Sequence, residues 1–384
     1  MGKKRDWRDR LNPRYVELAD LLVNYSTEVE GGNLVLLQTD VHIPHDMHVA
    51  VIETVREAGG VMMEPILSDP RLTAAARKGC TARQLAVNAA AYETLLLGAD
   101  VRIAFRAISN KVELSSVPGK DTQRHSQVLV NLIFEEALQY TRWVLTSWPT
   151  PAFAQLANMS TGAFEDLFFG AVLTDYAALG RAIKPLATLM NRTKKVKITG
   201  PDTDLSFSIE DIPTVICAGD RNIPDGEAFT AAVLGTMEGH ITFNTISVNS
   251  AGQRFEGIRL EFRKGKVVKA TCRAGNQHLL EQALDTDEGA RQVGEFAFGL
   301  NPNVTHAIGD TLFDEKIGGT LHMALGRCIP PADNGNSSSL HWDIVLDQRK
   351  PAGGGSVYFD GKLVRKNGLF VPDALQRLNR GIQQ

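Results

Sequence analysis

Short apolar runs alternate with segments of helical periodicity along the first half of the chain. The apolar runs predict buried strands, and the segments between them, whose apolar positions recur with the helical repeat, predict helices. Strands are predicted at 34–38, 62–66, 101–107 and 142–145, and helices at 14–24, 48–58, 86–97 and 125–140. Because the strands alternate with helices, the pattern favours a parallel sheet covered by helices.

The pattern changes in the second half. A long helical stretch follows Trp148-Pro149-Thr150-Pro151 and extends to about Arg192. From Lys194 onward, short alternating segments separated by turns predict strands, and Asp360-Gly361 marks a hairpin. We therefore expect an α/β domain with a parallel sheet at residues 1–195 and an α+β, mostly antiparallel domain at 196–384.

Composition narrows the class of protein. With 384 residues, 43% of them hydrophobic, the chain can form real cores, and at roughly 100–200 residues per domain it predicts two domains. Lys and Arg number 41 against 44 Asp and Glu, a net charge of −3, so no nucleic-acid partner is indicated.

The cysteines and the apolar runs bear on the location of the protein. Four cysteines lie far apart without a CxxC pair, which is typical of reduced thiols. The basic N-terminus lacks the apolar stretch of a signal peptide, and no run of about 18 apolar residues occurs. The sequence therefore predicts a cytoplasmic protein without a membrane partner.

Two carboxylates stand out in the second half. In RNIPDGEAFT, a Pro-Asp-Gly turn places Glu227 at the start of an extended run, where a solvated Glu would be the ordinary interpretation. In DEGARQVGEFAFG, Glu295 lies between Gly294 and Phe296 in apolar sequence. Because an unpaired buried carboxylate is costly, Glu295 needs either a salt-bridge partner or a metal ion.

Two histidines and an aspartate follow. His341 and Asp343 flank Trp342, so in a strand both point to the same face, and His322 alternates with Leu321 and Met323 in the same way. Imidazole and carboxylate ligands suit Zn, Mn, Co or Fe. The residues alone leave a metal site and ordinary core histidines about equally favoured.

Four segments together resemble the thermophilic metallo-aminopeptidase family, which contains aminopeptidase T and aminopeptidase S. They are RWVLTSWPTPAFAQLANMS, RNIPDGEAFT, FDEKIGGTLHMALG and NSSSLHWDIVLD, in the order of the family. The resemblance covers most of the chain. It implies an N-terminal α/β domain, a metal-binding catalytic C-terminal domain and a homodimer.

The resemblance also implies the chemistry of the site. Its ligands for two divalent ions, of unknown identity among Zn, Co, Mn and Mg, would be Glu227, Glu295, His322, His341 and Asp343. Glu295 would bridge the two ions, and Glu227 or Glu295 would act as the catalytic base. The implied activity is removal of N-terminal residues from a peptide or a related small-molecule substrate.

One departure from the family keeps alternatives open. The family places a Tyr, thought to stabilise the oxyanion, seven residues after the His of its GTxHxALG block, where this chain has Ile329. A ring-cleaving dioxygenase for dihydroxypyridine, which uses one iron, is similar to the family, and two of its ligands match His341 and Asp343. Its remaining His falls at Glu295, so the pattern favours the hydrolase over an iron dioxygenase, a hydrolase of a non-peptide substrate or an inactive binding protein.

Overall fold

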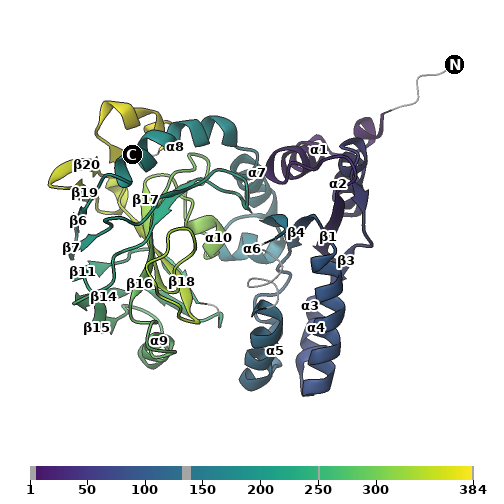
Figure 1. The fold of residues 1–384 in the computed structure, drawn as a ribbon, viewed down its shortest axis with the longest axis horizontal. Helices are drawn as coiled ribbons and strands as arrows, with labels where there is room; N and C mark the ends of the chain where they lie inside the picture. Colours follow the sequence, from purple (N-terminus) through teal and green to yellow (C-terminus); the bar gives the residue numbers. More distant parts are fainter. Residues whose placement is uncertain (1–5, 132–139, 250, 383–384) are drawn as a thin grey trace. The chain divides into compact units, whose positions relative to one another are not determined.

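The computed structural model describes residues 6–131, 140–249 and 251–382 (Figure 1). The chain divides into two compact units: residues 1–173 with 219–223, and residues 174–218 with 224–384. The units separate between Leu173 and Thr174, so the helix that follows belongs to the second unit. The domain limits 1–195 and 196–384 stay a prediction. Among the described residues, no helix has the length and apolar character needed to cross a membrane.

The first unit alternates strands and helices. Its strands are β1 (Leu34–Asp40), β2 (Val61–Met62), β3 (Ile66–Ser68), β4 (Val101–Arg106), β5 (Arg142–Ser147) and β9 (Asn222–Ile223). Its helical elements are η1 (Trp7–Arg10), α1 (Pro13–Asp20), η2 (Leu21–Ser26), α2 (His45–Glu57), α3 (Pro70–Arg77), α4 (Ala82–Leu97), η3 (Glu113–Ser116), α5 (Gly119–Asn131), α6 (Pro151–Leu156) and α7 (Thr161–Val172). The part of the predicted helix 125–140 that covers 132–139 lies outside the described residues.

The predicted parallel sheet is confirmed. Its strands run in the order β2-β1-β4-β5-β9, with β3 also paired to β1, and every recorded pairing is parallel. The single strand predicted at 62–66 is wrong: β2 and β3 are separate short strands, both beside β1. Pro65 explains the break, because it has no N–H to donate to the neighbouring strand.

Helix α4 shows how the helices cover this sheet. Thr81 begins it with a capping box, in which its hydroxyl accepts from the backbone N–H of Gln84 and the Gln84 side chain accepts from the N–H of Thr81. Leu96 near the end of α4 packs with Leu36 of β1 in one buried cluster. The apolar positions of the Ala-rich segment therefore form a packing face, as the sequence predicts.

The second unit consists mainly of short strands. They are β6 (Lys195–Gly200), β7 (Thr203–Ser208), β8 (Val215–Cys217), β10 (Glu227–Thr230), β11 (Glu238–Thr242), β12 (Ile246–Val248), β13 (Arg254–Glu256), β14 (Arg259–Arg263), β15 (Lys266–Thr271), β16 (Val293–Gly299), β17 (Thr320–Gly326), β18 (His341–Asp347), β19 (Ser356–Phe359), β20 (Lys362–Lys366) and β21 (Leu369–Phe370). The helical elements are α8 (Tyr176–Met190), α9 (Gln277–Leu284), α10 (Thr311–Asp314), η5 (Lys350–Ala352) and η6 (Asp373–Asn379).

These strands form two main antiparallel sheets, as predicted (Figure 1). We term them the large sheet, ordered β15-β14-β11-β7-β6-β19-β20-β21, and the site sheet, ordered β18-β17-β16-β10-β8. The predicted hairpin joins β19 to β20 at Asp360 and Gly361, whose φ angles of 48° and 78° lie in the left-handed region that favours glycine.

Aromatic side chains hold the two sheets together. The ring of Phe296 on β16 lies 5.1 Å from that of Phe207 on the large sheet, and the ring of Phe298 lies 5.7 Å from that of Phe370. Because alternate residues of a strand point to opposite faces, Phe296 and Phe298 face the large sheet, whereas Glu295 and Ala297 point the other way. The core therefore lies on one face of the site sheet and the polar chemistry on the other.

Candidate metal centre

The five predicted ligand residues project from one face of the site sheet. They are Glu227 on β10, Glu295 on β16, His322 on β17, and His341 and Asp343 on β18. The register pairs Glu295 with Ala324 and Ala324 with Asp343, and paired antiparallel residues share a face. His322 and His341 lie two residues from members of this row, and so they point the same way.

Small residues make room between these side chains. Across the ladders, Glu227 pairs with Gly299, His322 with Ala297, and His341 with Gly326. No bulky neighbour in the register competes with the polar groups for the space above the sheet.

A β-bulge sets the position of Glu295. The register between β16 and β17 shifts between Val293 and Glu295, around Gly294. A Cβ at Gly294 would lie 2.2 Å from the carbonyl oxygen of Gly326, so only glycine fits there. Since a bulge re-aims the side chain that follows it, Gly294 directs the Glu295 carboxylate into the site.

The polar atoms form two groups of three that share Glu295. One contains Glu227, Glu295 and His322, the other Glu295, His341 and Asp343, and within each group the candidate ligand atoms lie within 4.8 Å of one another. Nε2 of His322 lies 3.1 Å from Oε1 of Glu295, and Nε2 of His341 lies 3.7 Å from Oε2 of the same carboxylate. One carboxylate thus has an oxygen toward each group, the arrangement expected of a bridging ligand.

The two imidazoles differ in their surroundings. The side chain of His322 is 1% exposed, and that of His341 is 26% exposed. Nδ1 of His341 lies 2.8 Å from the carbonyl oxygen of Arg327 and donates to it when it carries the proton. This bond fixes the ring and leaves Nε2 directed at Glu295 and Asp343, as is typical of metal-bound histidines.

Three further residues, which the sequence analysis did not single out, join the cluster. The ammonium of Lys316 lies 2.7 Å from Oε1 of Glu227, 2.8 Å from Glu315 and 3.6 Å from Asp225. We term the five predicted ligands with Asp225, Glu315 and Lys316 the acidic centre. Asp225 had a detectable signal, because in an extended chain it shares a face with Glu227 two residues later.

Burial and charge shift the pKa values in the acidic centre. Burial raises the pKa of Glu295, and the charges of Asp343 and Glu227 raise it further. Burial also raises the pKa of Glu315, to about 8. Burial alone would lower the pKa of His341, but the Asp343 carboxylate outweighs it and raises that pKa to about 10. The carboxylates thus draw positive charge into the centre.

The donor set fits divalent cations. Among the residues that the structure describes, none forms a hydrogen bond with Oε2 of Glu227 or Oδ1 of Asp343, although both oxygens are buried. Buried carboxylate oxygens without partners are costly, and a cation satisfies them. Carboxylate oxygens and neutral imidazole nitrogens are ligands that Zn, Mn, Co and Fe share.

The loop of residues 327–340 joins β17 to β18 and leads directly into His341. Asp287 anchors it: the Ser338 hydroxyl donates to Oδ1 at 2.6 Å, and the backbone N–H and hydroxyl of Ser339 donate to Oδ2, both at 2.7 Å. Burial opposes the charge of Asp287, but these hydrogen bonds prevail and lower its pKa to about 2. Ile329 lies in the same loop and is 40% exposed.

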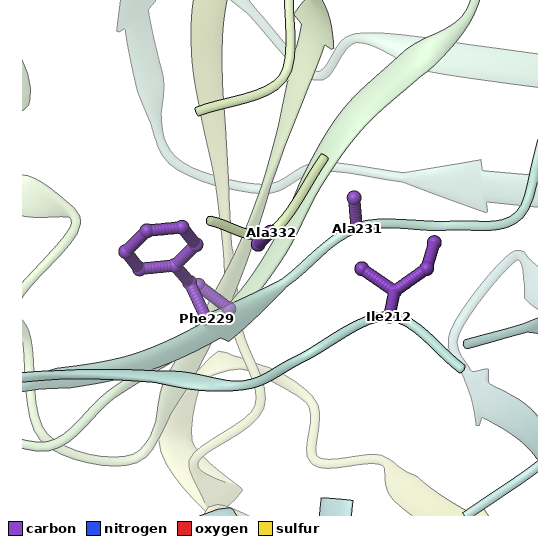
Figure 2. Packing of buried hydrophobic residues seen from close by; sticks show 5 residues of the cluster. Ile212, Phe229, Ala231 and Ala332 are labelled. Atoms are coloured by element: carbon purple, nitrogen blue, oxygen red, sulfur yellow. The ribbon is translucent and has the colours of Figure 1, made fainter. Parts of the chain in front are cut away.

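An apolar cluster lies beside the acidic centre (Figure 2). It contains Ile212, Phe229, Ala231, Ala297 and Ala332. Phe229 pairs with Ala297 across the ladder, two residues from Glu227, so it lies on the site face of the sheet. Ala332 belongs to the 327–340 loop, and the cluster therefore packs this loop against β10 with apolar contacts.

Fold and site together define a protein with a helix-covered parallel sheet and an antiparallel unit that carries buried carboxylates and imidazoles suited to divalent metals. The family described as thermophilic metalloprotease (M29) matches residues 12–370. The chain belongs to this family, which confirms the resemblance predicted from the four sequence segments.

Characterised relatives are similar over part of the chain. Aminopeptidase 2 of Geobacillus stearothermophilus is 35% identical over 133 residues, 33% of this chain and 30% of that protein. Aminopeptidase T of Thermus aquaticus is 30% identical over 200 residues, 45% of this chain and 46% of that protein. The chain thus matches less than half the length of these curated relatives.

Two solved structures are similar in fold. Wild-type AmpT from Thermus thermophilus superposes with a TM-score of 0.80 at 21% identity, over 94% of this chain and 99% of that one. A 2,5-dihydroxypyridine dioxygenase from Pseudomonas putida superposes with a TM-score of 0.60 at 16% identity, over 94% and 98%. The fold class predicted from the sequence is confirmed by the first likeness.

Proposed function

We propose that this protein is a metal-dependent aminopeptidase that removes N-terminal residues from peptides at a centre of two divalent ions. The observation that supports this proposal most strongly is the pair of ligand groups that share Glu295. Family membership and aminopeptidase-named relatives support the class of reaction.

The proposed ligands are Glu227, Glu295, His322, His341 and Asp343. When bound, two divalent ions lower the pKa of a water molecule and polarise a carbonyl oxygen, the two requirements of amide hydrolysis. Glu295 would neutralise both ions, and the hydrogen bond to Arg327 would hold His341 in the ligating orientation. Glu227 and Glu295 are the two candidates to accept the proton of the attacking water.

Two properties of the whole protein belong to the same proposal. We expect a homodimer, since two-fold pairs are the commonest assembly and the family resemblance implies one. We also expect a cytoplasmic location, because all four cysteines are free thiols. Zn, Co, Mn and Mg are the candidate ions.

Metal content and substrate turnover, measured on the same preparation, test the proposal. Protein purified without added metal is analysed for bound elements, then reconstituted and screened with aminoacyl amides and short peptides. Two ions per chain, with release of N-terminal residues that chelation abolishes, would support it. One iron per chain with oxygen uptake on a dihydroxypyridine would overturn it in favour of the dioxygenase.

A further inference from the structure

Lys316 is a fully buried cation inside the acidic centre, with a side chain 1% exposed. Its backbone is held on both sides: its N–H donates to the carbonyl of Phe313 at 3.0 Å, and its carbonyl accepts from the N–H of Asn301 at 2.9 Å. The position of its ammonium is therefore set by a fixed turn between α10 and β17.

The ammonium lies where another cation could bind. Besides the two groups that share Glu295, the ligand atoms of Cys217, Asp225 and Glu227 also lie within 4.8 Å of one another. Glu227 pairs with Cys217 across the β8–β10 ladder, which brings the thiol to this side of the centre. Lys316 forms ion pairs with two of the three members, Asp225 and Glu227.

Formal charge points the same way. The acidic centre contains five carboxylates: Asp225, Glu227, Glu295, Glu315 and Asp343. With neutral imidazoles, the Lys316 ammonium and two divalent ions balance these carboxylates. A third divalent ion would leave an excess of positive charge in a buried site, which is unfavourable.

We propose that Lys316 is a built-in cation that occupies the position between Asp225 and Glu227, holds these two carboxylates and Glu315 in place, and excludes a third metal ion from Cys217, Asp225 and Glu227. It is a positioning residue and not a catalytic one. The inference rests on the proposed dinuclear centre for the number of ions, but not for the effect of the lysine.

Cadmium tests this proposal because thiolates bind it well and give it an ultraviolet charge-transfer absorption. Metal-free protein is loaded with Cd²⁺, freed of excess ion by gel filtration, and analysed for cadmium per chain. We expect Lys316→Met to hold one more Cd²⁺ than the parent and to show the thiolate absorption. Adding Cys217→Ser should remove both the absorption and the extra ion, and Lys266→Met, a change at an exposed lysine, should bind as the parent does.

The comparison of variant with parent decides the outcome. A folded Lys316→Met protein that holds the same number of Cd²⁺ ions as the parent, without thiolate absorption, would overturn the proposal. If that variant does not fold, Glu315→Gln with Lys316→Met removes one charge of each sign and must show the same extra ion. A parent that holds fewer than two ions would contradict the dinuclear centre, whereas an extra ion in the variant would still support the role of Lys316.

Discussion

Replacing Asp287 with asparagine tests how the 327–340 loop is held against the rest of the second unit. The carboxylate accepts from Ser338 and Ser339 of the loop, and from the N–H groups of Gly289 and Ala290 at 3.1 and 3.0 Å. An amide keeps one acceptor oxygen and places an NH₂ donor where the other stood, so hydrogen bonds are lost together with the charge. We expect Asp287→Asn to destabilise the protein.

The pKa of Asp287 gives the size of the effect. A fall from 3.8 to about 2 corresponds to about 2.4 kcal/mol at 1.36 kcal/mol per pKa unit. Because the residue is partly exposed, solvent screening reduces this to roughly 1 kcal/mol. The folded-state pKa is the lower one, so this stability is present above about pH 4 and is lost as the pH falls toward 2.

Urea unfolding of metal-free protein at several pH values measures this contribution. The wild type should exceed Asp287→Asn by roughly 1 kcal/mol at pH 6, and about half of the part due to charge should be gone at pH 3. Glu288→Gln is the matched control, because the Glu288 side chain is 93% exposed and should contribute almost nothing. Equal stability of wild type and Asp287→Asn at pH 6, or a difference that does not shrink with acid, would refute the reasoning.

Three further predictions concern the proposed function. Glu295→Gln should lower kcat by about 100- to 10,000-fold with little change in unfolding, because it weakens both ligand groups while the apolar side chains around it still pack; near-normal turnover with two bound ions would rule out a bridging role. Ile329→Tyr should raise turnover of aminoacyl substrates by up to about 100-fold if the loop has only lost its oxyanion donor, and an unchanged or lower rate would indicate a loop rebuilt for another substrate. Light scattering at micromolar concentration should give the mass of two chains, and a monomer would contradict the homodimer.

The sequence predicts the site as well as it does because strands carry their geometry in their alternation. His341, Trp342 and Asp343 are enough to place two ligand-type side chains on one face, and the apolar residues around Glu295 are enough to indicate an unusual buried carboxylate. The convergence of four strands at that face is a property of register, which is set by long-range pairing and cannot be read from any one segment.

The features that the sequence left hidden depend on atoms far apart in the chain. Glu315 and Lys316, next to a Gly-Gly turn, have the pattern of solvated charges, and their burial follows from the bond between Lys316 and Asn301 and from the position of β10. Gly294 is one glycine among many until its Cβ is tested against the carbonyl of Gly326, which identifies it as the bulge that aims Glu295. A single chain can thus show which residue types are available for a metal centre, whereas the charge balance that limits the number of ions emerges only when the lysine is found among the carboxylates.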